Sequence, residues 1–165
     1  MKILPFVLGI ILLVALAAVP ASAFKAQDLS IVVLPNGDAQ VDFSYQLTWL
    51  EQAAVFAQIV NPAQQLQSAI EQNFHVPVTV SRVSSGETVL VISSFAPPVQ
   101  GTAGTTYTTP ALSFARAQEA LNRYWFAPLI QPDFAPAITT VTFPDGYQQT
   151  FTNQIAIPSI SHTVS

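Results

Sequence analysis

The sequence predicts an α+β protein in which three β-hairpins form one antiparallel sheet and helices pack on one face of it. Three observations lead to this class. Residues 40–49 alternate apolar and polar side chains, three glycine-containing turn sequences separate β-type segments, and the segments between hairpins have helical spacing of apolar residues. The predicted order is ββααββαββ, preceded by an N-terminal signal helix, and this order is typical of a layered α+β fold.

The first hairpin is predicted over residues 29–34 and 40–49. The first segment is apolar and largely β-branched, and the second has the strict period of two that defines a strand with one buried face. Its buried face is predicted to consist of Val41, Phe43, Tyr45, Leu47 and Trp49. The Asn36-Gly37 pair between the two segments is the pair favoured in type I′ turns, so a tight turn of this type is expected.

Two helices are predicted to follow. Residues 50–60 carry alanines and a phenylalanine without β alternation, which indicates a short helix. Asn61-Pro62 then supplies an N-cap and a proline at the first helical position, so a second helix is predicted over about 62–73. Its apolar residues recur at three- and four-residue spacing and are expected to face the sheet.

The second hairpin is predicted over residues 76–82 and 87–95, with its turn at Ser84-Ser85-Gly86. Pro77 cannot donate a backbone hydrogen bond, so the first strand of this hairpin is expected to lie at an edge of the sheet. Residues 97–106, rich in Pro, Gly and Thr, are predicted to form a flexible loop.

The last part of the chain is predicted to contain a third helix and a third hairpin. The helix begins at Thr109-Pro110 or at Ser113 and ends before Pro128. The hairpin consists of residues 137–143 and 147–153 around the turn Pro144-Asp145-Gly146, and residues 155–164 are predicted to form a final strand.

Residues 1–23 have the pattern of a secretory signal peptide. An apolar run over residues 3–19 follows a lysine, and Pro20-Ala21-Ser22-Ala23 provides the small residues of a cleavage site after Ala23. The apolar run is at the short limit for spanning a bilayer, so retention as an uncleaved anchor is the alternative. The sequence therefore predicts a secreted or cell-surface protein with one α+β domain over residues 24–165, which contacts a membrane only through residues 1–23 if these are retained.

The composition limits the classes of partner. Charged residues make up 8 % of the chain, and the four basic residues after residue 23 are scattered, so no basic patch for nucleic acid is expected. Cysteine is absent, which excludes disulfides and thiolate metal sites. A weakly charged surface allows copies of the chain to approach closely, so self-association or packing against envelope proteins is favoured.

Few side chains are candidates for catalysis or metal binding. The histidines His75 and His162 are far apart in the sequence, so no metal site and no cofactor are predicted. Most carboxylates lie in turns or on polar faces, and Asp133 alone lies in an irregular segment flanked by aromatic residues. Asp133, His75 and His162 are thus the candidate catalytic residues, although a loop-capping role is favoured for Asp133.

Three segments resemble small secreted or cell-surface proteins of methanogenic archaea. They are Ile138-Thr139-Thr140-Val141-Thr142-Phe143-Pro144-Asp145-Gly146-Tyr147, Ile157-Pro158-Ser159-Ile160 and Tyr107-Thr108-Thr109-Pro110. The resemblance implies an archaeal cell-surface setting and assigns no catalytic residue.

Two functions follow from these observations. The favoured one is an exported, non-enzymatic protein of the cell surface or envelope that acts through protein contacts or self-assembly, because the Thr-rich last hairpin and tail offer a strand edge. The alternative is a secreted hydrolase of polysaccharide or peptide that uses Asp133 with a second carboxylate or a histidine.

Overall fold

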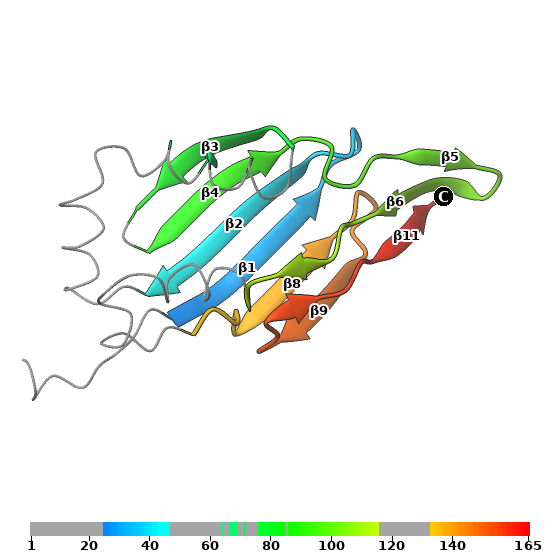
Figure 1. The fold of residues 1–165 in the computed structure, drawn as a ribbon. Coiled ribbons are helices and arrows are strands. Elements are labelled where there is room, and N and C mark those ends of the chain that lie inside the picture. Colours follow the sequence, from blue (N-terminus) through cyan, green and yellow to red (C-terminus); the bar gives the residue numbers. More distant parts are fainter. Residues whose placement is uncertain are drawn as a thin grey trace, which may run out of the picture.

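A six-stranded mixed sheet dominates the structure (Figure 1). The computed structural model describes residues 25–46, 64, 67–68, 71, 76–84, 86–115 and 133–165, and the fold is described for these residues. In spatial order the sheet consists of β3 (Val78–Val83), β4 (Glu87–Ile92), β2 (Ala39–Gln46), β1 (Lys25–Val33), β8 (Ile138–Thr142) and β9 (Gln148–Thr152).

Two smaller sheets come from segments between and after these strands. A three-stranded sheet has the order β11 (Ser161–Val164), β6 (Gly104–Thr108) and β5 (Val99–Gly101). Strand β7 (Leu112–Ser113) pairs with β10 (Ala156–Ile157). In Figure 1 the β6 and β11 strands lie in front of β8 and β9, and the β5–β6 hairpin extends past the end of the large sheet.

The predicted α+β class is wrong for the part of the chain that the structure describes. Of these residues 57 % are in strands and 5 % are helical, and they form no helix as an element. The three predicted hairpins are present as β1–β2, β3–β4 and β8–β9. The sheet is nevertheless mixed rather than antiparallel, because β1 pairs with β8 in parallel.

The layer on the sheet was predicted to be helical, but the described residues supply it with strands. Residues 97–106, predicted to be a loop, contain β5 and the start of β6. Their β-branched residues and Tyr107 have high strand propensity, and Gly101 and Gly104 flank the turn, so this composition suits a hairpin as well as a loop. A helix start at Thr109 is also wrong, because Leu112 and Ser113 form β7.

Several predictions fall outside the described residues. These are the signal helix in residues 1–23, the helix over 50–60, and most of the helices over 62–73 and beyond Ser113. Gln64, Gln67, Ser68 and Glu71 have helical backbone, but the residues between them are not described. Within the described residues, no helix is long and apolar enough to cross a membrane.

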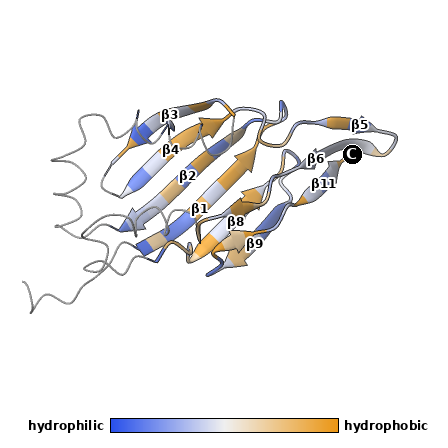
Figure 2. Cartoon of the chain, viewed as in Figure 1, coloured by the Kyte–Doolittle hydropathy of each residue, from blue (hydrophilic) through white to orange (hydrophobic). Residues whose placement is uncertain are grey.

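The hydrophobic core lies between the large sheet and the segments in front of it. Leu29, Ile31 and Val33 of β1 are buried together with Val141 of β8, and hydrophobic residues recur along β1, β4 and β8 (Figure 2). Core residues from outside the large sheet are Phe95, Ala96, Tyr107, Phe143 and Ile160. Burial of these side chains stabilises the contact between the sheets, at roughly 1.5–3 kcal/mol for each large apolar side chain.

The turn between β1 and β2 differs from the predicted type I′ turn. Gly37 has φ +87° whereas Asn36 does not have positive φ, and type I′ requires positive φ at both central residues. The Gly37 N–H donates to Leu34 O (2.9 Å), and the Leu34 N–H donates to Asp38 O (2.8 Å). This is the three-residue hairpin loop in which a turn is followed by a glycine bulge.

Candidate functional site

Asp133, the first candidate catalytic residue, has a local structural role. Its Oδ1 accepts a hydrogen bond from the Ala135 N–H (3.0 Å), and its backbone O accepts one from the Ala26 N–H (3.0 Å). The side chain is exposed and caps the turn that leads into β8. The loop-capping interpretation is therefore confirmed for this residue.

His162 is on β11, as expected for the C-terminal strand, but it is paired rather than freely exposed. Its Nε2–H donates to Asp145 Oδ2 at 2.7 Å, and 21 % of its side chain is exposed. The imidazole stacks on Tyr147, with centroids 4.2 Å apart and planes 9° apart, and its centroid lies 5.0 Å from that of Phe143. His162 thus joins β11 to the β8–β9 turn.

The structure does not bring Asp133 and His162 together. Asp133 lies beside Lys25 just before β8, whereas Asp145, the partner of His162, lies just after β8, so the two candidates are at opposite ends of this strand. His75 lies outside the described residues. Among the residues that are described, no three His, Asp or Glu side chains form a group that could hold a metal ion.

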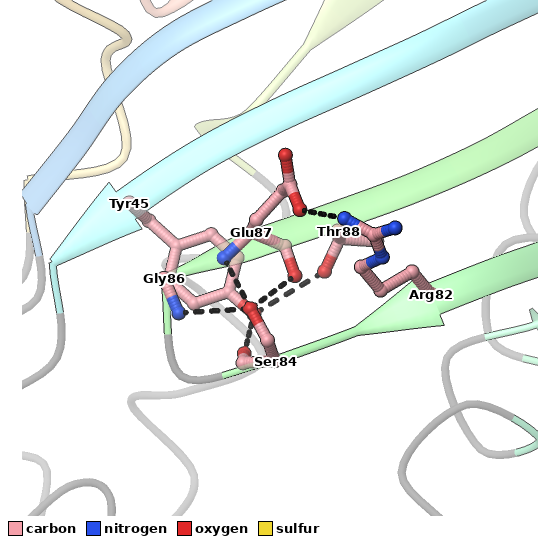
Figure 3. Close-up of polar contacts among 6 residues, drawn as sticks. All are labelled: Tyr45, Arg82, Ser84, Gly86, Glu87 and Thr88. Carbon is pink, nitrogen blue, oxygen red and sulfur yellow. Dashed lines mark hydrogen bonds and ion pairs between the residues drawn. The ribbon is translucent and has the colours of Figure 1, made fainter.

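One edge of the large sheet, β3, carries features that prevent pairing with another strand. Pro77 precedes the strand, as predicted for an edge, and the β3–β4 register shifts between Val80 and Arg82. The exposed Arg82 forms an ion pair with Glu87 (Nη1 to Oε2, 3.0 Å; Figure 3). Proline, bulges and charged side chains are the devices by which natural proteins block sheet edges.

Further hydrogen bonds fix the β3–β4 turn next to this edge (Figure 3). Ser84 Oγ accepts from the backbone N–H groups of Gly86 (3.3 Å) and Glu87 (3.0 Å). The Tyr45 hydroxyl donates to Ser84 O (2.7 Å) and also lies 3.2 Å from Thr88 Oγ1. These bonds fasten the β3–β4 turn to Tyr45 of β2.

The opposite edge, β9, has none of these blocking features. Its sequence, Gln148-Gln149-Thr150-Phe151-Thr152, contains no charge and no proline, and it pairs with β8 through five successive residues without a register shift. Within the described part of the chain, β8 is the only strand to which β9 is hydrogen-bonded. This edge is the candidate functional site.

The register shows which backbone groups of β9 face outward. The Phe143 N–H donates to Tyr147 O (2.8 Å), and the Asn153 N–H donates to Ala137 O (3.1 Å). Because hydrogen-bonded and non-hydrogen-bonded pairs alternate in an antiparallel ladder, Gln149 and Phe151 direct their backbone groups toward β8. The N–H and C=O groups of the alternate residues, Gln148, Thr150 and Thr152, therefore point away from the sheet.

Both ends of β9 are fixed by conformations that end a strand. Gly146 has φ +85° in the preceding turn, and Asn153 has φ +51° directly after the strand. Asp145 Oδ1 accepts from the Tyr147 N–H (3.0 Å), and the His162 hydrogen bond followed by this one lowers the pKa of the Asp145 carboxyl below its ordinary value. The ionised carboxylate thus holds both the turn and β11 in place.

Sequence reasoning predicted the β8–β9 hairpin, next to whose turn the ring centroids of Phe143 and Tyr147 lie 6.0 Å apart. It did not find the Asp145–His162 pair, because the turn and β11 meet only in the folded protein. It also did not locate the blocked edge fully, since a bulge leaves no clear signal in the sequence. Pro77 was the one residue that indicated it.

Comparisons with known proteins give no further assignment: no family model, no curated protein and no solved structure matches this chain.

Proposed function

We propose that this chain is an exported, non-enzymatic protein of the cell surface or envelope that acts by pairing its open sheet edge with another protein strand. The observation that carries the proposal is the contrast between the two edges of the large sheet. Strand β3 has a proline before it, a bulge and a charged side chain, whereas β9 is regular and uncharged. Addition of a strand to such an edge is a general mode of protein recognition.

The placement of the candidate catalytic residues also supports a contact function over hydrolysis. Two groups that act as acid and base must converge on one reacting bond. Asp133 caps a turn before β8, and His162 is bound to Asp145 after β8. Each of the two side chains therefore has a structural partner of its own.

The test uses residues 1–165, expressed in a host that can export them. Mass spectrometry of the exported form checks for cleavage after Ala23, and sedimentation over a wide concentration range measures association. We expect concentration-dependent association that Thr150→Lys on β9 weakens by about tenfold or more, because a charge on a sheet edge opposes strand addition.

Thr79→Lys on β3 is the matched control, because Thr79 is also an exposed threonine on an edge strand. This variant should associate like the unmodified chain. Equal effects of the two substitutions, or a chain that stays monomeric at every concentration and also associates with no other protein, would contradict the proposal that β9 is a contact edge.

A further inference from the structure

The open edge of β9 is self-complementary. Its outward-facing backbone groups belong to Gln148, Thr150 and Thr152, which are spaced symmetrically about Thr150. An antiparallel second copy centred on Thr150 would place Gln148 opposite Thr152 of the other copy, and Thr150 opposite Thr150. Every outward-facing N–H and C=O group would then have a partner, because these are the hydrogen-bonded positions of an antiparallel ladder.

We propose that the partner of β9 is the β9 strand of a second copy of this chain, paired antiparallel about a two-fold axis at Thr150. This inference rests on the proposed contact function and adds the partner and the register. The result is a continuous twelve-stranded sheet, formed from two copies of the six-stranded one. A two-fold interface of this kind closes after two copies.

The side chains of β9 suit this pairing. In the proposed register Thr140 lies beside Thr150 within each copy, so four threonines form a row across the interface. Cross-strand threonine pairs stabilise sheets, whereas like charges directly opposite each other destabilise them. Since residues 148–152 carry no charge, a copy of β9 meets no like charge when it pairs with itself.

The other edges explain why the partner is one copy rather than a growing chain of copies. Growth beyond a dimer along the large sheet would need a second open edge, but β3 is blocked by its bulge and by Arg82. In the smaller sheet the edge strands β5 and β11 have three and four residues. Short edge strands are themselves a protection against further pairing.

The ends of β9 limit the length of the paired segment. The turn at Gly146 and the left-handed conformation of Asn153 allow extended backbone only between them. A longer strand from an unrelated protein would therefore gain no hydrogen bonds beyond those that β9 itself offers. The symmetric register uses the whole of this extended segment.

Cysteine cross-linking tests the register, because the native chain contains no cysteine. In the proposed dimer the Cα atoms of the two Thr150 residues are about 5.5 Å apart, within the range for a disulfide. The two Gln148 residues are separated along the strands by four residue positions, so their Cα atoms lie roughly 13 Å apart, which is too far for a disulfide. Mild oxidation of the exported Thr150→Cys variant should therefore give a covalent dimer.

Three further samples make the result specific. Gln148→Cys alone should remain monomeric on denaturing gels, whereas an equal mixture of Gln148→Cys and Thr152→Cys should cross-link. Thr79→Cys on β3 measures cross-linking by random collision, and Thr150→Cys should exceed it by at least tenfold. Circular dichroism of each variant checks that the fold is retained.

The outcomes distinguish this inference from the proposed function. If the chain associates but Thr150→Cys cross-links no better than Thr79→Cys, the register is wrong and the contact function remains. If it associates only after a different protein is added, the second-copy partner is wrong. If it does not associate at all and Thr150→Lys has no effect on any contact, both proposals fail.

Discussion

The hairpins β1–β2 and β8–β9 close with the same turn but have different neighbours. In each, a glycine after Pro-Asn or Pro-Asp has φ near +85°, and its N–H donates to the residue before the proline at 2.9 Å. Strands β1 and β8 pair in parallel, so the turns lie at the same end of the sheet. Strand β2 then pairs with β4, whereas β9 pairs with no second strand among the described residues.

The turns also differ in what they contact. In the β1–β8 register Ile31 lies beside Val141. The first turn begins at Leu34, three residues after Ile31, whereas the second turn begins at Phe143, two residues after Val141. A shift of one residue reverses the face on which a side chain lies. The first turn contacts residues 96–98, and its Pro35 O accepts a hydrogen bond from the Tyr107 hydroxyl (3.0 Å), whereas Asp145 and Tyr147 of the second turn contact His162 of β11. Local sequence sets the hairpin, and sheet position sets its contacts.

Replacing the equivalent glycines of the two turns, Gly37 and Gly146, by alanine separates the effect of the local turn sequence from the effect of its position in the sheet. A Cβ on Gly37 would lie 2.7 Å from Pro98 Cδ and 2.9 Å from Ala96 O, whereas a Cβ on Gly146 has no atom within 4 Å. Both substitutions incur the cost of positive φ, about 1–2 kcal/mol, and only Gly37→Ala adds steric overlap. We expect losses of unfolding free energy of about 3 kcal/mol for Gly37→Ala and about 1 kcal/mol for Gly146→Ala.

Urea unfolding of the two variants measures this difference directly. Because the φ values of the two glycines agree within a few degrees, each variant serves as the control for the other. Equal losses would show that residues 96–98 move aside for the added Cβ without a cost in stability.

These hairpins also show how much of the fold could be predicted from sequence. Each hairpin is indicated by side chains that alternate with a period of two and by a turn sequence of Gly with Pro, Asn or Asp. These signals lie within about twenty residues of one another in the sequence. The parallel pairing of β1 with β8 joins segments more than a hundred residues apart and has no local signal. The prediction of a loop over residues 97–106 was wrong for the same reason, since β6 needs β11, some 50 residues later, to complete its sheet.

The candidate site was predicted in part. The Thr-rich last hairpin was expected to offer a strand edge, and its position at the end of the sheet agrees with that expectation. Asp133 and His162 were selected because their residue types can do chemistry, but a sequence does not show which titratable groups are already bonded. The bond of Asp133 to Ala135 is local and agrees with the loop-capping role expected from the sequence, whereas the bond of His162 to Asp145 joins two segments that meet only in the folded protein.

A second test removes the clamp of the β8–β9 turn, by which we mean the contacts of His162 with Asp145 and Tyr147. His162→Ala deletes the ring that stacks on Tyr147 and contacts Phe143, so we expect a loss of about 1 kcal/mol of unfolding free energy. Asp145→Asn retains the stacked rings and weakens only the hydrogen bonds that the carboxylate accepts from His162 and the Tyr147 N–H, so its effect should be smaller. Thermal unfolding of both variants gives the order, and an Asp145→Asn effect as large as that of His162→Ala would show that stacking is not the main contact.

The smallest expected effect is the pH dependence of the same clamp. The hydrogen bond from His162, and next that from the Tyr147 N–H, lowers the pKa of Asp145 in the folded protein. In the unfolded chain this carboxyl titrates near its ordinary pKa of about 4. The stabilisation is therefore present above that ordinary value and is lost as the pH falls through the lower, folded pKa.

The other carboxylates also protonate in this range, so the quantity to measure is the difference in unfolding free energy between the native chain and Asp145→Asn, from about pH 6 to about pH 2. That difference should shrink on acidification, and one that stays constant would show that the ionised form of Asp145 does not hold the β8–β9 turn to β11.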